Sequence, residues 1–129
     1  MPRKVYLTDT GYITALVPYA DMGKLLENAV YLELYRRYWH DPRIEIAYWT
    51  DGKREVDFIV KYGNKVLEAI QVCYDISAID TREREVDALI RAMKTFKITK
   101  GTIVTGYHKE VIKRDKLTIH ILLSLIHIS

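Results

Sequence analysis

Cysteine, glycine and long apolar runs are all scarce in this sequence of 129 residues. The single cysteine, Cys73, excludes an internal disulfide and is consistent with a cytosolic protein. No apolar run approaches the length of a membrane-spanning helix, and Met1 is followed by a mixed polar and apolar stretch instead of the apolar core of a signal peptide. We therefore expect a cytoplasmic protein with no membrane partner.

The six glycines are isolated from one another, so the sequence contains no glycine-rich phosphate-binding loop of the Walker type. Repeats and low-complexity segments are also missing from the sequence. If the natural protein hydrolyses ATP, we expect ATP to bind in an upstream domain outside this chain.

The composition is that of an ordinary single globular domain, with 49% apolar and 29% charged residues. The net charge of +3 permits a nucleic acid partner without requiring one. Tyrosine is unusually frequent, with 10 residues. Its ring adds apolar area and its hydroxyl a polar group, which suits half-buried sheets and binding surfaces.

Apolar spacing predicts an α/β sandwich with two helices and six strands. The helices are expected from Asp21 to about residue 40 and over 81–96. The strands are expected over 5–7, 44–49, 54–61, 65–74, 102–105 and 117–121, with turns at 50–53 and at Gly63-Asn64. Lys100-Gly101 is interpreted as a break before a strand.

Local patterns define the two helices further. The first helix is expected to carry one stripe of apolar residues, namely Met22, Leu25, Leu26, Ala29 and Val30, with Leu32 and Leu34 at its margins. The second is expected to begin with a capping box, in which Asp80 or Thr81 is followed by Glu83 or Glu85.

The segment from Arg54 to Asp75, REVDFIVKYGNKVLEAIQVCYD, places three polar side chains in an apolar hairpin. Side chains alternate along a strand, so Asp57 should share a face with Ile59, away from Val56, and Gln71 and Cys73 should project together from the next strand. A buried carboxylate needs a cation or hydrogen-bond donors. A divalent metal with oxygen ligands would meet that need.

These residues resemble the PD-(D/E)XK nuclease superfamily. Asp57 matches the family's Asp, Gln71-Val72-Cys73 falls at its (E/Q)-x-K tripeptide, and Glu27 matches the Glu of the preceding helix. More narrowly, the chain is similar to an uncharacterised C-terminal domain of archaeal and bacterial AAA-type ATPases. Five segments carry this likeness in order: RKVYLTDTGY, GKLLENAVYLELYRR, EVDFIV, IQVCYDI and TREREVDAL.

The resemblance implies a restriction-endonuclease-like fold, a central mixed sheet flanked by helices, and metal-dependent hydrolysis of DNA. Asp57, Gln71 and Glu27 would hold Mg²⁺ or Mn²⁺, and Cys73 would occupy the position of the catalytic Lys. The metal would lower the pKa of an attacking water. Contact with an AAA-type ATPase domain is also implied.

Two residues depart from the family pattern. Gln71 brings an amide oxygen but no charge, and Cys73 removes the cation. One fixed donor is typically worth about 3–4 kcal/mol in catalysis, so the site should be weakened or inactive. The alternative function is a catalytically dead module that binds nucleic acid or a protein partner for the ATPase.

Each site residue also has a structural interpretation. Asp57 could pair with Arg54 or Lys53, Gln71 could satisfy a hydrogen bond at the sheet, and Cys73 could be a small buried residue. On the first helix Glu33 competes with Glu27, which the family pattern favours. Glu68 would reach the site only through a β-bulge.

Exposed basic residues have two interpretations as well. The second helix interleaves arginines with acidic residues, which predicts ion pairs on a solvated face. Phosphate contacts by Arg36, Arg37, Lys94 and Lys97 are the alternative.

The expected domain division has three parts. Residues 1–20 would join a missing upstream ATPase, 21–121 would form the nuclease-like domain, and 122–129 would be a cloning or adapter artefact. The terminal sequence LSLIHIS resembles the translation of a transposon end used in DNA library preparation. A genuine apolar strand is the alternative.

Overall fold

The computed structural model describes residues 22–123. The expected strand over 5–7, the joining segment 1–20 and the terminal residues 124–129 lie outside this part. The elements are α2 (Met22–Tyr38), β1 (Ile44–Thr50), β2 (Glu55–Tyr62), β3 (Lys65–Val72), α3 (Ile79–Phe96), β4 (Lys100–Val104), β5 (Glu110–Arg114) and β6 (Leu117–Leu122). Neither of the described helices is long and apolar enough to cross a membrane.

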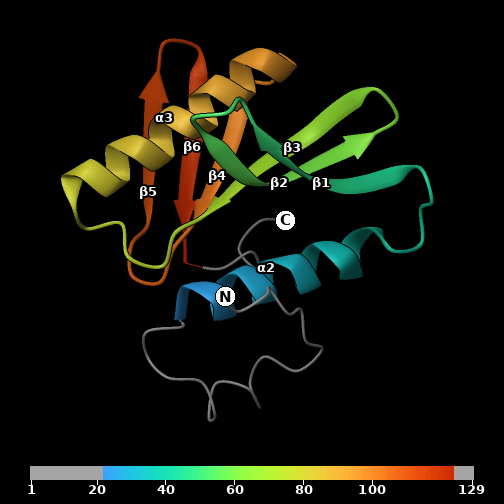
Figure 1. The fold of residues 1–129 in the computed structure, drawn as a ribbon, viewed down its shortest axis with the longest axis horizontal. Helices are drawn as coiled ribbons and strands as arrows, with labels where there is room; N and C mark the ends of the chain where they lie inside the picture. Colours follow the sequence, from blue (N-terminus) through green and yellow to red (C-terminus); the bar gives the residue numbers. More distant parts are fainter. Residues whose placement is uncertain (1–21, 124–129) are drawn as a thin grey trace.

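The six described strands form one mixed sheet in the order β1-β2-β3-β4-β6-β5 (Figure 1). The first three strands pair antiparallel, β3 pairs parallel with β4, β4 pairs parallel with β6, and β5 returns antiparallel beside β6. Helix α3 makes the crossover between the parallel strands β3 and β4, the usual connection for such a pair. The expected mixed sheet flanked by helices is confirmed.

The two helices cover opposite faces of the sheet. Ile59, Ala69 and Ile103 belong to the apolar cluster beneath α3. Their neighbours Val60, Ile70 and Val104 belong to the cluster beneath α2. Because successive side chains of a strand point to opposite faces, these neighbouring pairs define two separate core layers.

The buried stripe of α2 differs from the expected one. The buried residues are Glu27, Asn28, Val30 and Leu34, while Met22, Leu25, Leu26 and Ala29 are only partly buried. Glu27, Val30 and Leu34 follow helical spacing along the side that faces the sheet. The predicted position of Val30 on the buried stripe is confirmed, and Leu34, expected at its margin, is fully buried. The rest of the prediction was wrong because it assigned the inward face by apolar residues alone, whereas this helix buries two polar ones.

Several element boundaries also differ. β3 ends at Val72, so Cys73 and Tyr74 lie in the loop that follows, and β5 was not predicted. Helix α3 begins at Ile79, and its N-cap is Ala78 without a side-chain cap hydrogen bond, so the capping-box prediction was wrong. Lys100-Gly101 starts β4 instead of breaking the chain before it.

Strict alternation fails along β2. Ala47 pairs with Ile59 while Trp49 pairs with Val56, so β2 has one residue more than β1 between these pairs. Val56 and Ile59 consequently lie in the same core cluster, beneath α3. The prediction that they face opposite sides was wrong. The irregularity falls at Asp57-Phe58, beside the candidate site.

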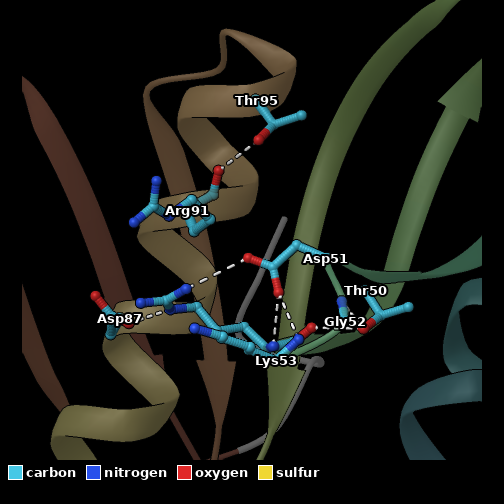
Figure 2. A network of polar contacts seen from close by, with 8 residues as sticks. Thr50, Asp51, Gly52, Lys53, Asp87, Arg91 and Thr95 are labelled. Atoms are coloured by element: carbon cyan, nitrogen blue, oxygen red, sulfur yellow. Dashed lines mark hydrogen bonds and ion pairs between the residues drawn. The ribbon is translucent and has the colours of Figure 1, made fainter.

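The β1–β2 turn is held against α3 by a polar network (Figure 2). Asp51 Oδ1 accepts hydrogen bonds from the backbone N–H groups of Lys53 and Arg54 at 2.9 and 2.7 Å. Thr50 Oγ1 donates to the carbonyl of Arg54 at 2.8 Å. The Arg54 guanidinium forms ion pairs with Asp51 and with Asp87 of α3. The network therefore fixes the start of β2, two residues before Asp57.

Gly101 is required by the packing of α3 on β4. A Cβ atom at this position would lie 2.7 Å from Met93 Sδ and 3.0 Å from Leu89 Cδ2, and both side chains are fully buried. Gly101→Ala should lower the free energy of unfolding by about 1–3 kcal/mol through overpacking.

Urea denaturation measures this effect. The control is Gly23→Ala in α2, where a Cβ would meet nothing within 4 Å. That change should be neutral or stabilising by about 0.5–1 kcal/mol, because Ala is the better helix former. Equal stability of Gly101→Ala and the wild type would contradict the packing described.

Candidate functional site

Asp57 of β2 and Gln71 of β3 come together, as the sequence predicts. The backbone N–H of Asp57 donates to Gln71 Oε1 at 3.1 Å, and Gln71 Nε2 donates to the carbonyl of Glu55 at 2.9 Å. In return, the backbone N–H of Val72 donates to Asp57 Oδ2 at 2.8 Å. Each side chain thus bonds to the main chain of the opposite strand. We call these three hydrogen bonds the Asp57–Gln71 clasp.

The clasp lies where the direct pairing of β2 with β3 ends. The backbone ladder between them ends with the pair Phe58 and Ile70. Along its opposite edge, β3 pairs with β4 from Ile70 to Val72. Backbone groups left without ladder partners in a buried layer need others. Gln71, with 2% of its surface exposed, supplies such partners to β2.

Cys73 follows the end of β3, and its side chain packs against the cluster beneath α3. Its backbone N–H donates to the carbonyl of Val104 at 2.9 Å. Burial, with an added contribution from the Glu85 carboxylate, raises the pKa of the thiol to about 11. Cys73 is therefore a neutral, half-buried thiol at neutral pH, neither a nucleophile nor a cation.

The surroundings of Cys73 are acidic. Glu85 of α3 is largely buried, and this burial raises the pKa of its carboxyl, with a smaller contribution from Glu55. Arg84 opposes the shift through an ion pair at 3.6 Å. Cys73, which the family resemblance matches to a Lys, thus lies within the fields of Glu85 and Arg84.

Glu27 lies on α2, on the stripe that faces the sheet, and 8% of its surface is exposed. Its competitor Glu33 instead bonds to Arg36 and Arg37, so the choice between the two acids agrees with the burial of Glu27. Glu27 and Cys73 belong to layers on opposite faces of the sheet. The expected role of Glu27 as a metal ligand stays a prediction.

Glu68 does not substitute for a missing ligand. A second register shift between Val60 and Lys61 does disturb β3 near this residue. However, the Glu68 carboxylate accepts a hydrogen bond from the hydroxyl of Tyr38, at the end of α2. Burial and this bond raise the pKa of Tyr38 to about 12. Tyr38 lies eleven residues from Glu27, about 16 Å along the helix.

The donor set fits a divalent metal poorly. Gln71 is uncharged, and its amide is held at both ends by main-chain groups. One oxygen of Asp57 is bonded to the N–H of Val72. Within residues 22–123, no three or more His, Cys, Asp and Glu side chains are grouped so that they could hold a metal ion. The structural interpretation of Gln71, as a partner for sheet hydrogen bonds, matches its contacts.

A second site was missed by the sequence reasoning. A surface pocket of about 550 Å³ lies where the loops after β3 and β4 meet the start of α3, lined by Asp75, Ile76, Ser77, Arg82, Tyr107 and His108. Arg82 and His108 both bond to Glu110 and hold the pKa of its carboxyl at about 2. The meeting of two parallel strand ends with a helix start could have indicated this pocket.

Comparison with known protein families assigns the chain to one of them. A family model described as a domain of unknown function, DUF4143, matches residues 22–125. The chain belongs to this family. It is also 36% identical over 95 residues to an uncharacterised protein of Methanocaldococcus jannaschii, MJ1544. That match covers 74% of this chain and 21% of the relative, so the chain spans about a fifth of its length.

The fold of this DUF4143 domain has a counterpart among solved structures. A chain from a tetradecameric assembly of Thermococcus gammatolerans McrB AAA+ hexamers with bound McrC superposes with a TM-score of 0.55. The sequences are 15% identical, and the match covers 80% of this chain and 28% of that one. This likeness establishes a shared fold. The specific PD-(D/E)XK assignment and the origin of residues 122–129 stay predictions.

The clasp predicts a stability cost at Gln71. Gln71→Leu would leave the N–H of Asp57 and the carbonyl of Glu55 without their partner. We expect a loss of about 1–3 kcal/mol in the free energy of unfolding. Leu67→Gln, at an exposed position of the same strand, should change it by no more than about 0.5 kcal/mol. Equal urea midpoints for Gln71→Leu and the wild type would argue against the clasp.

The raised pKa of Glu85 predicts a pH-dependent gain on removing its charge. Its folded pKa lies above the ordinary value of 4.5, so the folded state loses stability as the pH rises through and above this range. Glu85→Gln should therefore raise the melting temperature at pH 7, and the gain should shrink towards pH 4.

The control for this prediction is Glu83→Gln, an exposed position on the same helix, which should leave the melting temperature nearly unchanged at both pH values. A gain for Glu85→Gln that is equal at pH 7 and pH 4 would contradict the electrostatic cause.

Proposed function

We propose that this chain is a non-catalytic module of an AAA-type ATPase, built on a PD-(D/E)XK-like sheet whose metal-site positions have a structural role. The main observation in support of this proposal is the Asp57–Gln71 clasp, in which both side chains are hydrogen-bonded to main-chain groups of the opposite strand. The module would act by binding a partner for the ATPase.

The chemistry of Cys73 also supports a non-catalytic role. A nuclease of the resembled type needs a cation where Cys73 lies, and the thiol of Cys73 is neutral with a pKa of about 11. The nearby Glu85 would add negative charge to an already anionic phosphodiester substrate instead of neutralising it. Arg84 lowers the pKa of the Cys73 thiol, but its guanidinium is ion-paired with Glu85. These charges support a non-catalytic role for the clasp.

The proposed association with an ATPase rests on two likenesses. Five segments of the sequence resemble a domain carried by AAA-type ATPases, and the fold resembles a chain from an assembly of McrB AAA+ hexamers with bound McrC. The chain itself has no glycine-rich phosphate loop. ATP would accordingly bind to another part of the natural protein.

A metal-dependent DNA nuclease is the second candidate function. The observation in its favour is Glu27, a carboxylate buried on the sheet-facing side of α2, as the family pattern requires of its helical ligand. In this case Glu27 and Asp57 would hold Mg²⁺ or Mn²⁺ with Gln71 as a neutral ligand.

Nicking of supercoiled plasmid in Mn²⁺ separates the two candidates. We expect the wild type to nick no faster than Asp57→Ala, because the chain lacks the cation at Cys73. Thermal melting with millimolar Mn²⁺ should give the same midpoint as melting without metal. Nicking that vanishes in Asp57→Ala, or a metal-dependent rise in melting temperature that this variant loses, would establish the nuclease instead.

The association with an ATPase is checked on the full-length Methanocaldococcus jannaschii relative, of which this chain matches 21%. The purified relative should hydrolyse ATP. A folded full-length relative that neither binds nor hydrolyses ATP would contradict this part of the proposal.

A further inference from the structure

One half of the sheet presents an open face on the side opposite to α3. Lys100 pairs with Thr118, which pairs in turn with Lys113. The next row on the same face joins Thr102, His120 and Val111. We call these six residues the β4–β6–β5 face.

The orientation of this face follows from its neighbours. Gly101, Ile119 and Ile112 form the row between the two. Ile119 and Ile112 belong to the cluster beneath α3, and a Cβ at Gly101 would meet Met93 of that helix. By alternation, the rows on either side point away from α3.

Helix α2 leaves this part of the sheet open. The described residues that pack beneath α2 come from β1, β2, β3 and the end of β4, and none comes from β5 or β6. Lys100, Lys113 and Val111 are exposed, and Thr102, Thr118 and His120 are partly exposed. The strand β5 is also the edge of the sheet, so a partner can approach from the side.

The charge on the β4–β6–β5 face has a single sign. Its charged side chains at neutral pH are Lys100 and Lys113, and none of its six residues is acidic. Glu110, the acidic residue of β5, pairs with Ile121 of the α3 layer and bonds to Arg82 of α3. A polyanion could therefore lie across the face without meeting a carboxylate of these rows.

We propose that the β4–β6–β5 face binds the sugar–phosphate backbone of a nucleic acid. Lys100 and Lys113 are two strand spacings apart, about 10 Å, so their flexible side chains can reach different phosphates of one nucleic acid backbone. The Thr hydroxyls and the His120 ring lie between them. Lysine and hydroxyl side chains are common partners of phosphate oxygens.

The composition of the face favours nucleic acid over other anionic partners. Val111, with 52% of its surface exposed, is its one large apolar side chain. A membrane surface would require apolar residues that insert between lipids, and a protein interface would require an apolar core. The six residues include no Phe, Tyr or Trp, and His120 carries the one ring on which a base could stack. Because Lys and Thr would contact phosphates, binding should be largely independent of sequence.

This inference uses residues outside the clasp and holds whether or not the chain hydrolyses DNA.

The test is fluorescence anisotropy with labelled 20-nucleotide duplexes of two unrelated sequences, at several salt concentrations. The wild type should bind both with Kd values within twofold. The double variant Lys100→Glu with Lys113→Glu should bind at least tenfold more weakly. Its slope of log K against log salt should be shallower by about two, for two lost phosphate contacts.

The matched control is Lys53→Glu with Lys65→Glu, which makes the same change in net charge at two exposed positions, one in the β1–β2 turn and one at the start of β3. It should weaken binding less than threefold. Lys100→Gln with Lys113→Gln provides a milder pair if charge reversal impairs folding. Equal losses in the two double variants, no binding by the wild type at low salt, or tighter binding to phosphatidylserine vesicles than to DNA would each overturn the proposal.

Discussion

Hydrogen bonding at the place where the ladder between β2 and β3 ends is the constraint on which this domain depends. β3 pairs antiparallel with β2 along its first part and parallel with β4 along its last residues. The N–H of Asp57 and the carbonyl of Glu55 lie beyond the last pair of this ladder, in a partly buried region, and need other partners. The Gln71 side chain supplies both partners, and the Asp57 carboxylate in return accepts a hydrogen bond from the N–H of Val72 in β3.

The same constraint shapes the chemistry. An acid and an amide at the end of the β2–β3 ladder are well placed to bind a metal. They are equally well placed to form hydrogen bonds with backbone N–H and carbonyl groups that have no ladder partner. In this chain the contacts favour the second use. Gln71 is neutral and nearly inaccessible, and the thiol of Cys73 is held neutral by burial and by Glu85. A site that combined these groups would lack the positive charge that phosphate chemistry requires.

The sequence predicted some parts of this arrangement and not others. The hairpin around Gly63, with its positive φ, followed from turn chemistry, and the meeting of Asp57 with Gln71 followed from the family resemblance. Alternation failed at Val56, because an extra residue in β2 cannot be read from an apolar pattern. The inward face of α2 was misassigned because Glu27 and Asn28 are buried there. The strand β5 was not predicted, because three of its five residues are charged and are exposed or partly exposed, as is common in an edge strand.

Paramagnetic broadening by Mn²⁺ in a ¹⁵N-labelled sample is the most direct test of the structural role of the clasp. A metal held by Asp57 would broaden the amide signals of Asp57 and Val72 first, because these N–H groups lie against the clasp oxygens. Our account predicts that these two signals broaden no more than those beside the exposed turn carboxylate of Asp51. Selective loss of the Asp57 and Val72 signals at low Mn²⁺ would contradict it and show that the site still binds metal.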